Sequence, residues 1–306
     1  MEQVTTRSGR RLAFDVTGAR NGYPVFLMHG TPGSRNGPKP RGIVLHRLGL
    51  KLICYDRPGY GGSDRQPERS VQDAAHDVVT IADSLGLDQF AMVGRSGGGP
   101  HALACAAALP NRVSRTATLV SLAPMNIDSD ELNWFQGMNE QNVQAHAPAE
   151  LDTSSSLAGI RAWAERAREN PKEFIALLTT QLSERDKRVT EDVVLRRLLT
   201  ETYAEALRQG PVGWIDDVLA FHRPWGVDLS RISTPVLLWH GAEDTFSPVG
   251  HTRWLGAKIP RAEVQIDSGI GHFGAIEVLP RILAWVVDGL AKARSPGTPI
   301  VRPATP

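Results

Sequence analysis

The sequence predicts an α/β fold with a mostly parallel, eight-stranded sheet that is flanked by helices and interrupted by a helical insertion. Short runs of Val, Ile and Leu alternate with helix-like segments along most of the 306 residues. Uninterrupted apolar runs are typical of strands that a parallel sheet buries on both faces. The alternation stops over residues 125–222, where only helix-like segments remain. We therefore expect an α/β core of residues 1–124 and 223–294, and a helical cap of residues 125–222 between the sixth and seventh strands.

Eight segments have the composition of strands. The first two form a hairpin within QVTTRSGRRLAFDVTG, and its turn is Ser8-Gly9. The other six are PVFLMHG ending at Gly30, LKLICYD at Asp56, FAMVGRS at Ser96, TATLVSLAP at Pro124, PVLLWHG at Gly241 and AEVQID at Asp267. Ligands of open α/β sheets gather at the carboxyl ends of the strands, so the polar residues there are the first site candidates.

Helix-like segments separate most of these strands. One covers residues 70–87, with Ser70 as a candidate N-cap and Gly86 as a stop, and the last covers residues 277–293. Within the insertion we expect helices over residues 157–170, 171–186 and 190–210, the last with Thr190 as N-cap and Gly210 as stop. Proline and small residues dominate residues 295–306, which predicts a disordered tail.

Composition excludes several classes of protein. The net charge is +1, so no basic face for nucleic acid is indicated. The two cysteines, Cys54 and Cys105, lie in apolar segments, which argues against a disulfide framework or a zinc site and favours a reducing cytosol. No apolar stretch suits a signal peptide or a membrane span. We expect a cytoplasmic protein that acts on a small molecule, with no nucleic acid or membrane partner.

The insertion is acidic. It holds 17 Asp and Glu against 10 Lys and Arg, a net charge of −7 that leaves +8 for the rest of the chain. Ordinary solvated helix faces explain such an excess. The alternative is an acidic lid that attracts a cationic group of the substrate.

The stretch MVGRSGGG, which begins at Met92, places a serine between a strand-like run and an alanine-rich helix-like run. A strand that reverses directly into a helix needs a strained residue at the apex and small residues two positions away on each side. Gly94, Ser96 and Gly98 meet this G-x-S-x-G pattern. The pattern predicts a nucleophile elbow at Ser96, and an ordinary Gly/Ser turn is the alternative.

Serine needs a base within hydrogen-bond reach, and the base needs an orienting carboxylate. On a fold of this kind the partners follow in the order Ser, Asp, His, each in a loop after a later strand. WHGAEDTFSP follows the seventh strand and offers Asp244, and DSGIGHFG follows the eighth and offers His272. Glu243 and Asp128 are the rival carboxylates, and Asp244 fits the spacing best.

Of the nine histidines, only His272 lies in the loop expected for a base. His29 and His240 each precede a glycine at a strand end, and we interpret them as hydrogen-bonding loop backbone. The other six have no matching carboxylate pattern and are interpreted as surface or packing residues: His46, His76, His101, His146, His222 and His251.

The oxyanion of an acyl-transfer reaction needs two donors. We expect one from the backbone N–H of Gly97, at the start of the helix after the elbow, and the other from the N–H of Thr31 in HGTPGS. The alternative for HGTPGS is a plain Pro/Gly turn. No metal or organic cofactor is implied.

Five motifs in this order resemble the α/β-hydrolase fold superfamily over residues 1–294. They are HGTPGS, DRPGYGGSD, GRSGG, HGAED and GHFG. The resemblance implies a Ser-Asp-His triad, a cap that shapes the substrate pocket, and a structural rather than catalytic role for DRPGYGGSD. Epoxide hydrolases and haloalkane dehalogenases carry aspartate at the elbow, so Ser96 favours acyl transfer to water.

Three functions follow as hypotheses. The first is hydrolysis of a carboxylic ester, a lactone or a thioester through an acyl-enzyme at Ser96. The second is a proline iminopeptidase-like aminopeptidase, because HGTPG is similar to the HGGPG of those enzymes and an acidic cap would hold an amino terminus. The third is a weakly catalytic ligand receptor on the same fold. Arg95, beside Ser96, is interpreted as a residue that packs or pairs with a loop carboxylate, and the alternative is that it favours an anionic substrate.

Overall fold

The computed structural model describes residues 1–146, 153–180 and 182–293, so the predicted tail at 295–306 lies outside the described residues. Its centre is one eight-stranded sheet in the order β1-β2-β4-β3-β5-β6-β7-β8. The strands are β1 (Glu2–Thr5), β2 (Arg11–Gly18), β3 (Tyr23–Met28), β4 (Leu50–Tyr55), β5 (Phe90–Arg95), β6 (Val113–Leu119), β7 (Val236–Gly241) and β8 (Ala262–Asp267). Only the pairs β1–β2 and β2–β4 are antiparallel, which confirms the predicted sheet.

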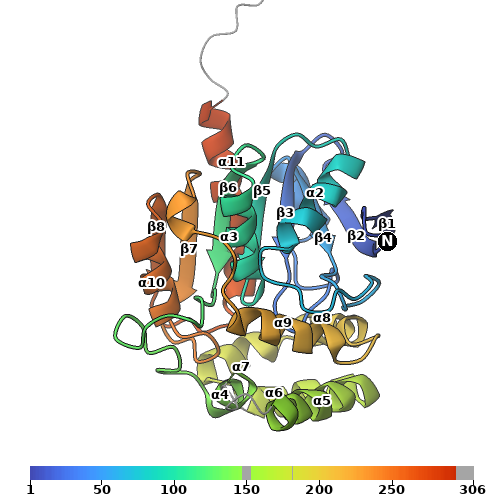
Figure 1. Ribbon diagram of the computed structural model, residues 1–306, viewed down its shortest axis with the longest axis vertical. Coiled ribbons are helices and arrows are strands. Elements are labelled where there is room, and N and C mark those ends of the chain that lie inside the picture. Colours follow the sequence, from blue (N-terminus) through green and yellow to red (C-terminus); the bar gives the residue numbers. More distant parts are fainter. Residues whose placement is uncertain (147–152, 181, 294–306) are drawn as a thin grey trace, which may run out of the picture.

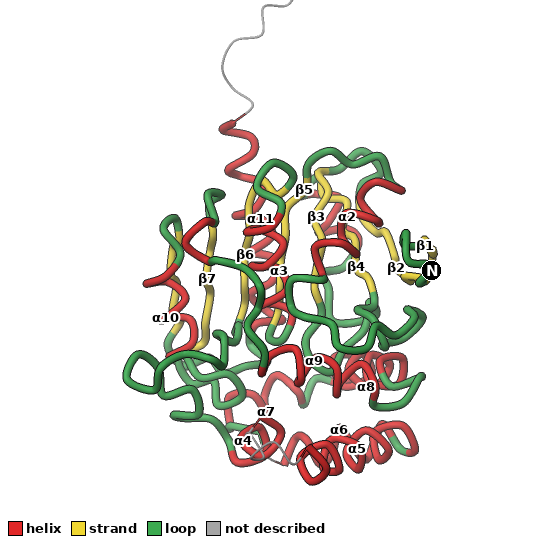
Figure 2. Tube along the Cα trace, viewed as in Figure 1, coloured by secondary structure: helices red, strands yellow, loops and turns green. Residues whose placement is uncertain are grey.

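Helices cover both faces of this sheet, and Figure 2 shows the strands between two helical layers. One face packs on α2 (Ala74–Ser84), α3 (Gly98–Ala108) and α10 (Gly250–Lys258). The other packs on α1 (Gly42–Arg47) and α11 (Ala275–Ala293). Successive residues of β5 enter the two cores alternately, so the strand is buried on both faces as its apolar run predicts. The edge strand β8 is the exception, since Val264 is 40% exposed.

In the described part of residues 125–222, six α-helices lie between β6 and β7. They are α4 (Glu140–His146), α5 (Thr153–Glu169), α6 (Pro171–Thr180), α7 (Glu184–Thr190), α8 (Val193–Ala206) and α9 (Val212–His222). Figure 1 shows them gathered at one end of the sheet, with α9 nearest to it. Their apolar side chains form a separate core that also includes Tyr60 and Phe273 from the loops of the sheet domain. The insertion is therefore helical over its described residues, and we call these helices the cap from their position at the end of the sheet.

Several predicted boundaries were wrong. Thr190 does not cap a helix, because its hydroxyl donates to the Asp186 carbonyl inside α7, and Asp192 caps α8 instead by accepting from the N–H of Leu195 at 2.8 Å. The helix predicted over 171–186 is two helices. Helix α2 begins at Ala74, after a turn in which Ser70 donates to Asp73. Strand β6 ends at Leu119 rather than at Pro124.

Candidate active site

Ser96 lies at a sharp turn between β5 and α3, as the G-x-S-x-G pattern predicts. Its φ is +53°, a left-handed conformation that is unusual for any residue except glycine. A Cβ at Gly94 would come within 3.0 Å of the Gly98 carbonyl, and a Cβ at Gly98 would come that close to the Met28 carbonyl. Both positions therefore require glycine for strand and helix to pass each other.

His272 and Asp244 meet in the loops after β8 and β7. Nδ1 of His272 lies 2.8 Å from Oδ2 of Asp244, and both residues are buried. Because Nδ1 then carries the proton that it donates to the carboxylate, Nε2 is left as an acceptor, which is the tautomer a general base needs. Ser96 and His272 line the same cavity.

The carboxylate of Asp244 is held ionised by its surroundings. Its Oδ1 accepts from the backbone N–H groups of Phe246 at 2.7 Å and Ser247 at 3.1 Å. Oδ2 lies 3.3 Å from Nε2 of His240. Burial alone would raise the pKa of Asp244, but the charge of His272 and the hydrogen bonds from His240 and His272 hold it below its ordinary value. His240 hydrogen-bonds the loop carbonyl of Ser247 at 2.6 Å, as predicted from the sequence, and it also contacts this carboxylate.

The rival carboxylates lie elsewhere. Glu243 is half exposed and faces Arg185 at 3.6 Å. Asp128 accepts from the N–H of Asp130 in an exposed turn. Neither contacts His272 in a hydrogen bond among the residues that the structure describes.

Thr31 and Gly97 lie against each other, since a Cβ on Gly97 would collide with the Thr31 side chain. The Gly30 carbonyl accepts from Nδ1 of His29 at 2.7 Å and from Nη2 of Arg57 at 3.0 Å. A planar trans peptide places its N–H opposite its carbonyl. The N–H of Thr31 is therefore directed away from Arg57. Gly30, the other residue of this peptide, lies beside the Ser96 side chain.

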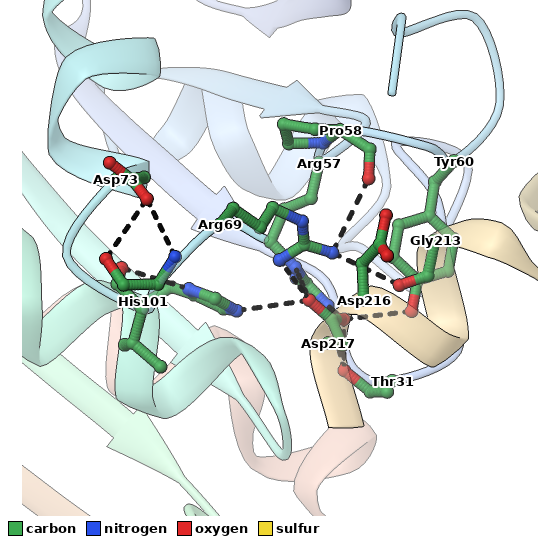
Figure 3. Close-up of polar contacts among 12 residues, drawn as sticks. Thr31, Arg57, Pro58, Tyr60, Arg69, Asp73, His101, Gly213, Asp216 and Asp217 are labelled. Carbon is green, nitrogen blue, oxygen red and sulfur yellow. Dashed lines mark hydrogen bonds and ion pairs between the residues drawn. The ribbon is translucent and has the colours of Figure 1, made fainter. Parts of the chain in front are cut away.

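A buried ionic cluster joins this loop to the cap (Figure 3). Asp217 of α9 accepts from the Thr31 hydroxyl at 2.6 Å, from Arg57 at 2.5 Å and from Tyr60 at 2.9 Å, and it pairs with Arg69 at 2.7 Å. Burial alone would raise the pKa of Asp217, but the charges of Arg57 and Arg69 hold it well below its ordinary value. The cluster therefore fixes the Thr31 loop from the cap side.

A second cap carboxylate holds the His272 loop. Asp186 of α7 accepts from the backbone N–H of His272 at 3.0 Å and from that of Phe273 at 2.7 Å. It is fully buried, and burial raises its pKa. The acidic excess of the cap is therefore only partly a matter of solvated faces, because Asp186 and Asp217 bind the loops that carry His272 and Thr31.

The cavity above Ser96 encloses about 850 Å³ of space, including its open mouth. Core loops contribute Gly30, Thr31, Ser96, Gly97 and His272 to its wall, and the cap contributes both polar and apolar side chains. The polar ones from the cap are Gln141, Asn142, His146 and Tyr203, and the apolar lining residues of cap and core are Pro32, Leu122, Phe174, Leu178, Trp214, Phe221, Phe246 and Phe273. No Asp or Glu of the described chain lines the cavity, so the described acidic residues of the insertion would not make the contact with a bound substrate that the predicted alternative of an acidic lid requires.

Two of the histidines interpreted as surface or packing residues, His101 and His251, are buried in polar contacts, whereas His146 packs against the rings of Trp134 and Phe221. Nε2 of His101 lies 3.4 Å from Asp217, a carboxylate partner that the sequence pattern did not indicate. His251 accepts from the N–H of Ala123 and contacts the Trp134 carbonyl. His146 lines the cavity. Burial lowers the pKa values of His101 and His251 to about 4 and that of His146 to about 3, so all three are neutral at pH 7.

Over the described ranges, no group of three or more His, Cys, Asp or Glu side chains could hold a metal ion. Helices in the same part of the chain are all too short or too polar to cross a membrane.

The doubly wound sheet, the serine elbow and the His–Asp pair define a hydrolase-type site. Residues 23–278 match the family model described as the alpha/beta hydrolase fold, so the chain belongs to that family. It is 32% identical to a non-heme chloroperoxidase of Streptomyces lividans over 92% of this chain and 96% of that one. It is 25% identical to a 2-hydroxymuconate semialdehyde hydrolase of Pseudomonas putida over 89% and 88% of the two chains.

Solved structures agree on the fold. An esterase from Thermogutta terrifontis superimposes with a TM-score of 0.68 at 24% identity, covering 96% of this chain and 99% of that one. The enol-lactonase from Burkholderia xenovorans LB400 gives a TM-score of 0.67 at 18% identity, with 95% and 100% covered. The family match and the chloroperoxidase relative together make the chain an enzyme of the α/β-hydrolase superfamily.

Proposed function

We propose that this enzyme hydrolyses a carboxylic ester of a small molecule through an acyl-enzyme on Ser96. The observation that carries the proposal is the His272–Asp244 pair, at 2.8 Å, on the same cavity as the strained Ser96 elbow. His272 takes the proton of the Ser96 hydroxyl as the oxygen attacks the carbonyl. Asp244 orients the ring and stabilises its charged form. Lactones and thioesters would react by the same steps.

The N–H groups of Thr31 and Gly97 would bind the oxyanion of the tetrahedral intermediate. Gly97 precedes α3, so its N–H also benefits from the dipole of that helix. The hydrogen bonds to the Gly30 carbonyl orient the Thr31 peptide before substrate arrives. His272 then returns its proton to the leaving alcohol, and water repeats the cycle on the acyl-enzyme.

We infer that residues 125–222 act as a cap that selects the substrate. Phe174, Leu178, Trp214 and Phe221 from the cap form much of the apolar wall above Ser96, which suits an apolar acyl or alcohol group. The aminopeptidase alternative needs a carboxylate to hold an amino terminus, and the described cavity wall offers none.

The test is steady-state hydrolysis of 4-nitrophenyl acetate, butyrate and octanoate beside proline 4-nitroanilide. We expect ester turnover that falls by roughly a thousandfold or more in Ser96→Ala, as removal of a triad member generally costs. Turnover of the anilide alone would favour the peptidase. Slow single turnover with strong stabilisation by a ligand would favour the receptor. Ester turnover that survives in Ser96→Ala within tenfold would refute the mechanism.

A further inference from the structure

Arg95 is the only arginine among the described residues that line the cavity, and no Asp, Glu or Lys is among them. It is the last residue of β5, directly before Ser96, and it is partly buried. Consecutive Cα atoms are about 3.8 Å apart, so the backbone of Arg95 adjoins that of the proposed nucleophile. Arg95 also lines a second, smaller cavity beside His29 and Ser34. It is a permanent cation at neutral pH.

No carboxylate compensates this charge in the described part of the chain. No ion pair or hydrogen bond there engages the Arg95 side chain. Tyr203 of α8, across the cavity wall, is the neighbour whose ionised form would favour the cation. Burial raises the pKa of that phenol, which keeps it neutral at pH 7. The loop carboxylate that the sequence left open as a partner is thus absent from the described residues.

Three arginines that are more deeply buried than Arg95 all have carboxylate partners. Arg35 pairs with Asp56, and Arg57 and Arg69 both pair with Asp217, each within 2.7 Å. An unpaired buried charge costs several kcal/mol, which explains why those three are matched with carboxylates. Arg95 alone among these four faces an open cavity without a partner, and burial lowers its pKa accordingly. Such an arrangement is typical of a group whose counter-ion arrives with a ligand.

We propose that Arg95 binds a carboxylate of the substrate, so that the preferred substrates are esters carrying a free carboxylate a few bonds from the scissile carbonyl. This inference rests on the proposed esterase function. A guanidinium binds a carboxylate through two parallel hydrogen bonds. One cation without a counter-charge in the described wall matches the single charge of a carboxylate, whereas a phosphate monoester would bring a charge of about −1.5 to −2.

The experiment compares each anionic ester with its own methyl ester, so that only the charge differs. One pair carries the carboxylate on the acyl side: mono-4-nitrophenyl adipate and its methyl ester. The other carries it on the alcohol side: 4-(butanoyloxy)benzoate and its methyl ester. The ratio of kcat/KM within each pair is measured for the wild type, Arg95→Met, Arg95→Lys and Arg197→Met. Loss of folded protein lowers both members of a pair equally, so the ratio reports on recognition alone.

We expect the wild type to prefer the acid in at least one pair, and Arg95→Met to lower that ratio by about ten- to hundredfold, mainly through KM. This range follows from the strength of charge-assisted hydrogen bonds. Arg95→Lys should retain part of the preference. Arg197→Met makes the same change of charge where the side chain is 82% exposed, on α8, and should leave the ratio within about twofold.

Equal ratios in the wild type and Arg95→Met would overturn the inference while leaving a Ser96-dependent esterase intact. If no ester is hydrolysed, the proposed function fails. The inference about Arg95 is then tested separately, by the binding of carboxylates to the protein. Adipate and 4-hydroxybenzoate should raise the Tm of the wild type but not that of Arg95→Met. No rise in the wild type, or the same rise in both proteins, would overturn it.

Discussion

Substitution of Asp217 by alanine should destabilise the protein far more than substitution of its neighbour Asp216. Asp217 is fully buried and is the shared acceptor for Arg57, Arg69, Tyr60 and Thr31. Without it, two buried guanidinium groups lose their counter-charge, which typically costs about 3–5 kcal/mol.

A chain of this length has an entropy of unfolding of roughly 0.6 kcal/mol/K, so the expected fall in Tm is about 5–8 °C. Asp216→Ala is the matched control. It removes an adjacent carboxylate whose partner Arg65 is 44% exposed and can turn into solvent, so we expect a cost near 1 kcal/mol and a fall of about 2 °C.

The assay is calorimetry or circular dichroism of the two variants beside the wild type, with ester turnover measured well below both Tm values. Turnover of Asp217→Ala should also fall, because Arg57 loses the carboxylate that fixes it against the Gly30 carbonyl. Equal Tm values for the two variants would refute the reasoning that the cluster links cap to core.

Three further results are expected. Asp186→Asn should lower kcat by about tenfold or more with a small change in Tm, because the N–H groups of the loop that carries His272 lose charged acceptors. An unchanged kcat would contradict the view that Asp186 positions His272. Gly94→Ala should abolish folding or turnover, whereas Gly159→Ala, with open space around its Cβ, should be neutral or stabilising by about 0.5–1 kcal/mol in thermal unfolding. Burial lowers the pKa of His251 to about 4, so on acidification the unfolded chain binds a proton at this ring before the folded chain does, and the free energy of unfolding falls as pH drops from about 6.5 to 4. In urea titrations, His251→Gln should reduce this pH dependence by about 1.4 kcal/mol per pH unit. An unchanged pH dependence would count against a buried neutral ring.

Local sequence patterns were sufficient to predict most of the sheet and the candidate site. The apolar runs were sufficient for β3 to β7, because a strand buried on both faces has few polar positions, whereas β1 and β2 were predicted from a hairpin turn. The elbow at Ser96 was predictable because the crossing of strand and helix allows only glycine at positions 94 and 98. Asp244 and His272 were predictable from their places after β7 and β8, and the structure brings the two together.

Contacts between distant segments were not predictable in the same way. Asp186 and Asp217 are two of 17 acidic residues in the insertion, and nothing local separates them from those on exposed faces. Their burial depends on how α7 and α9 pack on the loops of the core. Helix α9 itself was missed because it is buried on most sides and lacks a clear polar face. A hint was available in its Asp216-Asp217 pair, which stands inside an apolar segment without a nearby cation in the sequence.

The central claim, that Ser96 is the nucleophile, is tested most directly by covalent labelling. The wild type is incubated with diethyl 4-nitrophenyl phosphate, and the intact mass and the labelled peptide are measured by mass spectrometry. The account predicts one diethylphosphoryl group per chain, on Ser96, formed in step with the loss of ester turnover and absent in Ser96→Ala. A label on another residue, or full turnover after Ser96 is labelled, would contradict it.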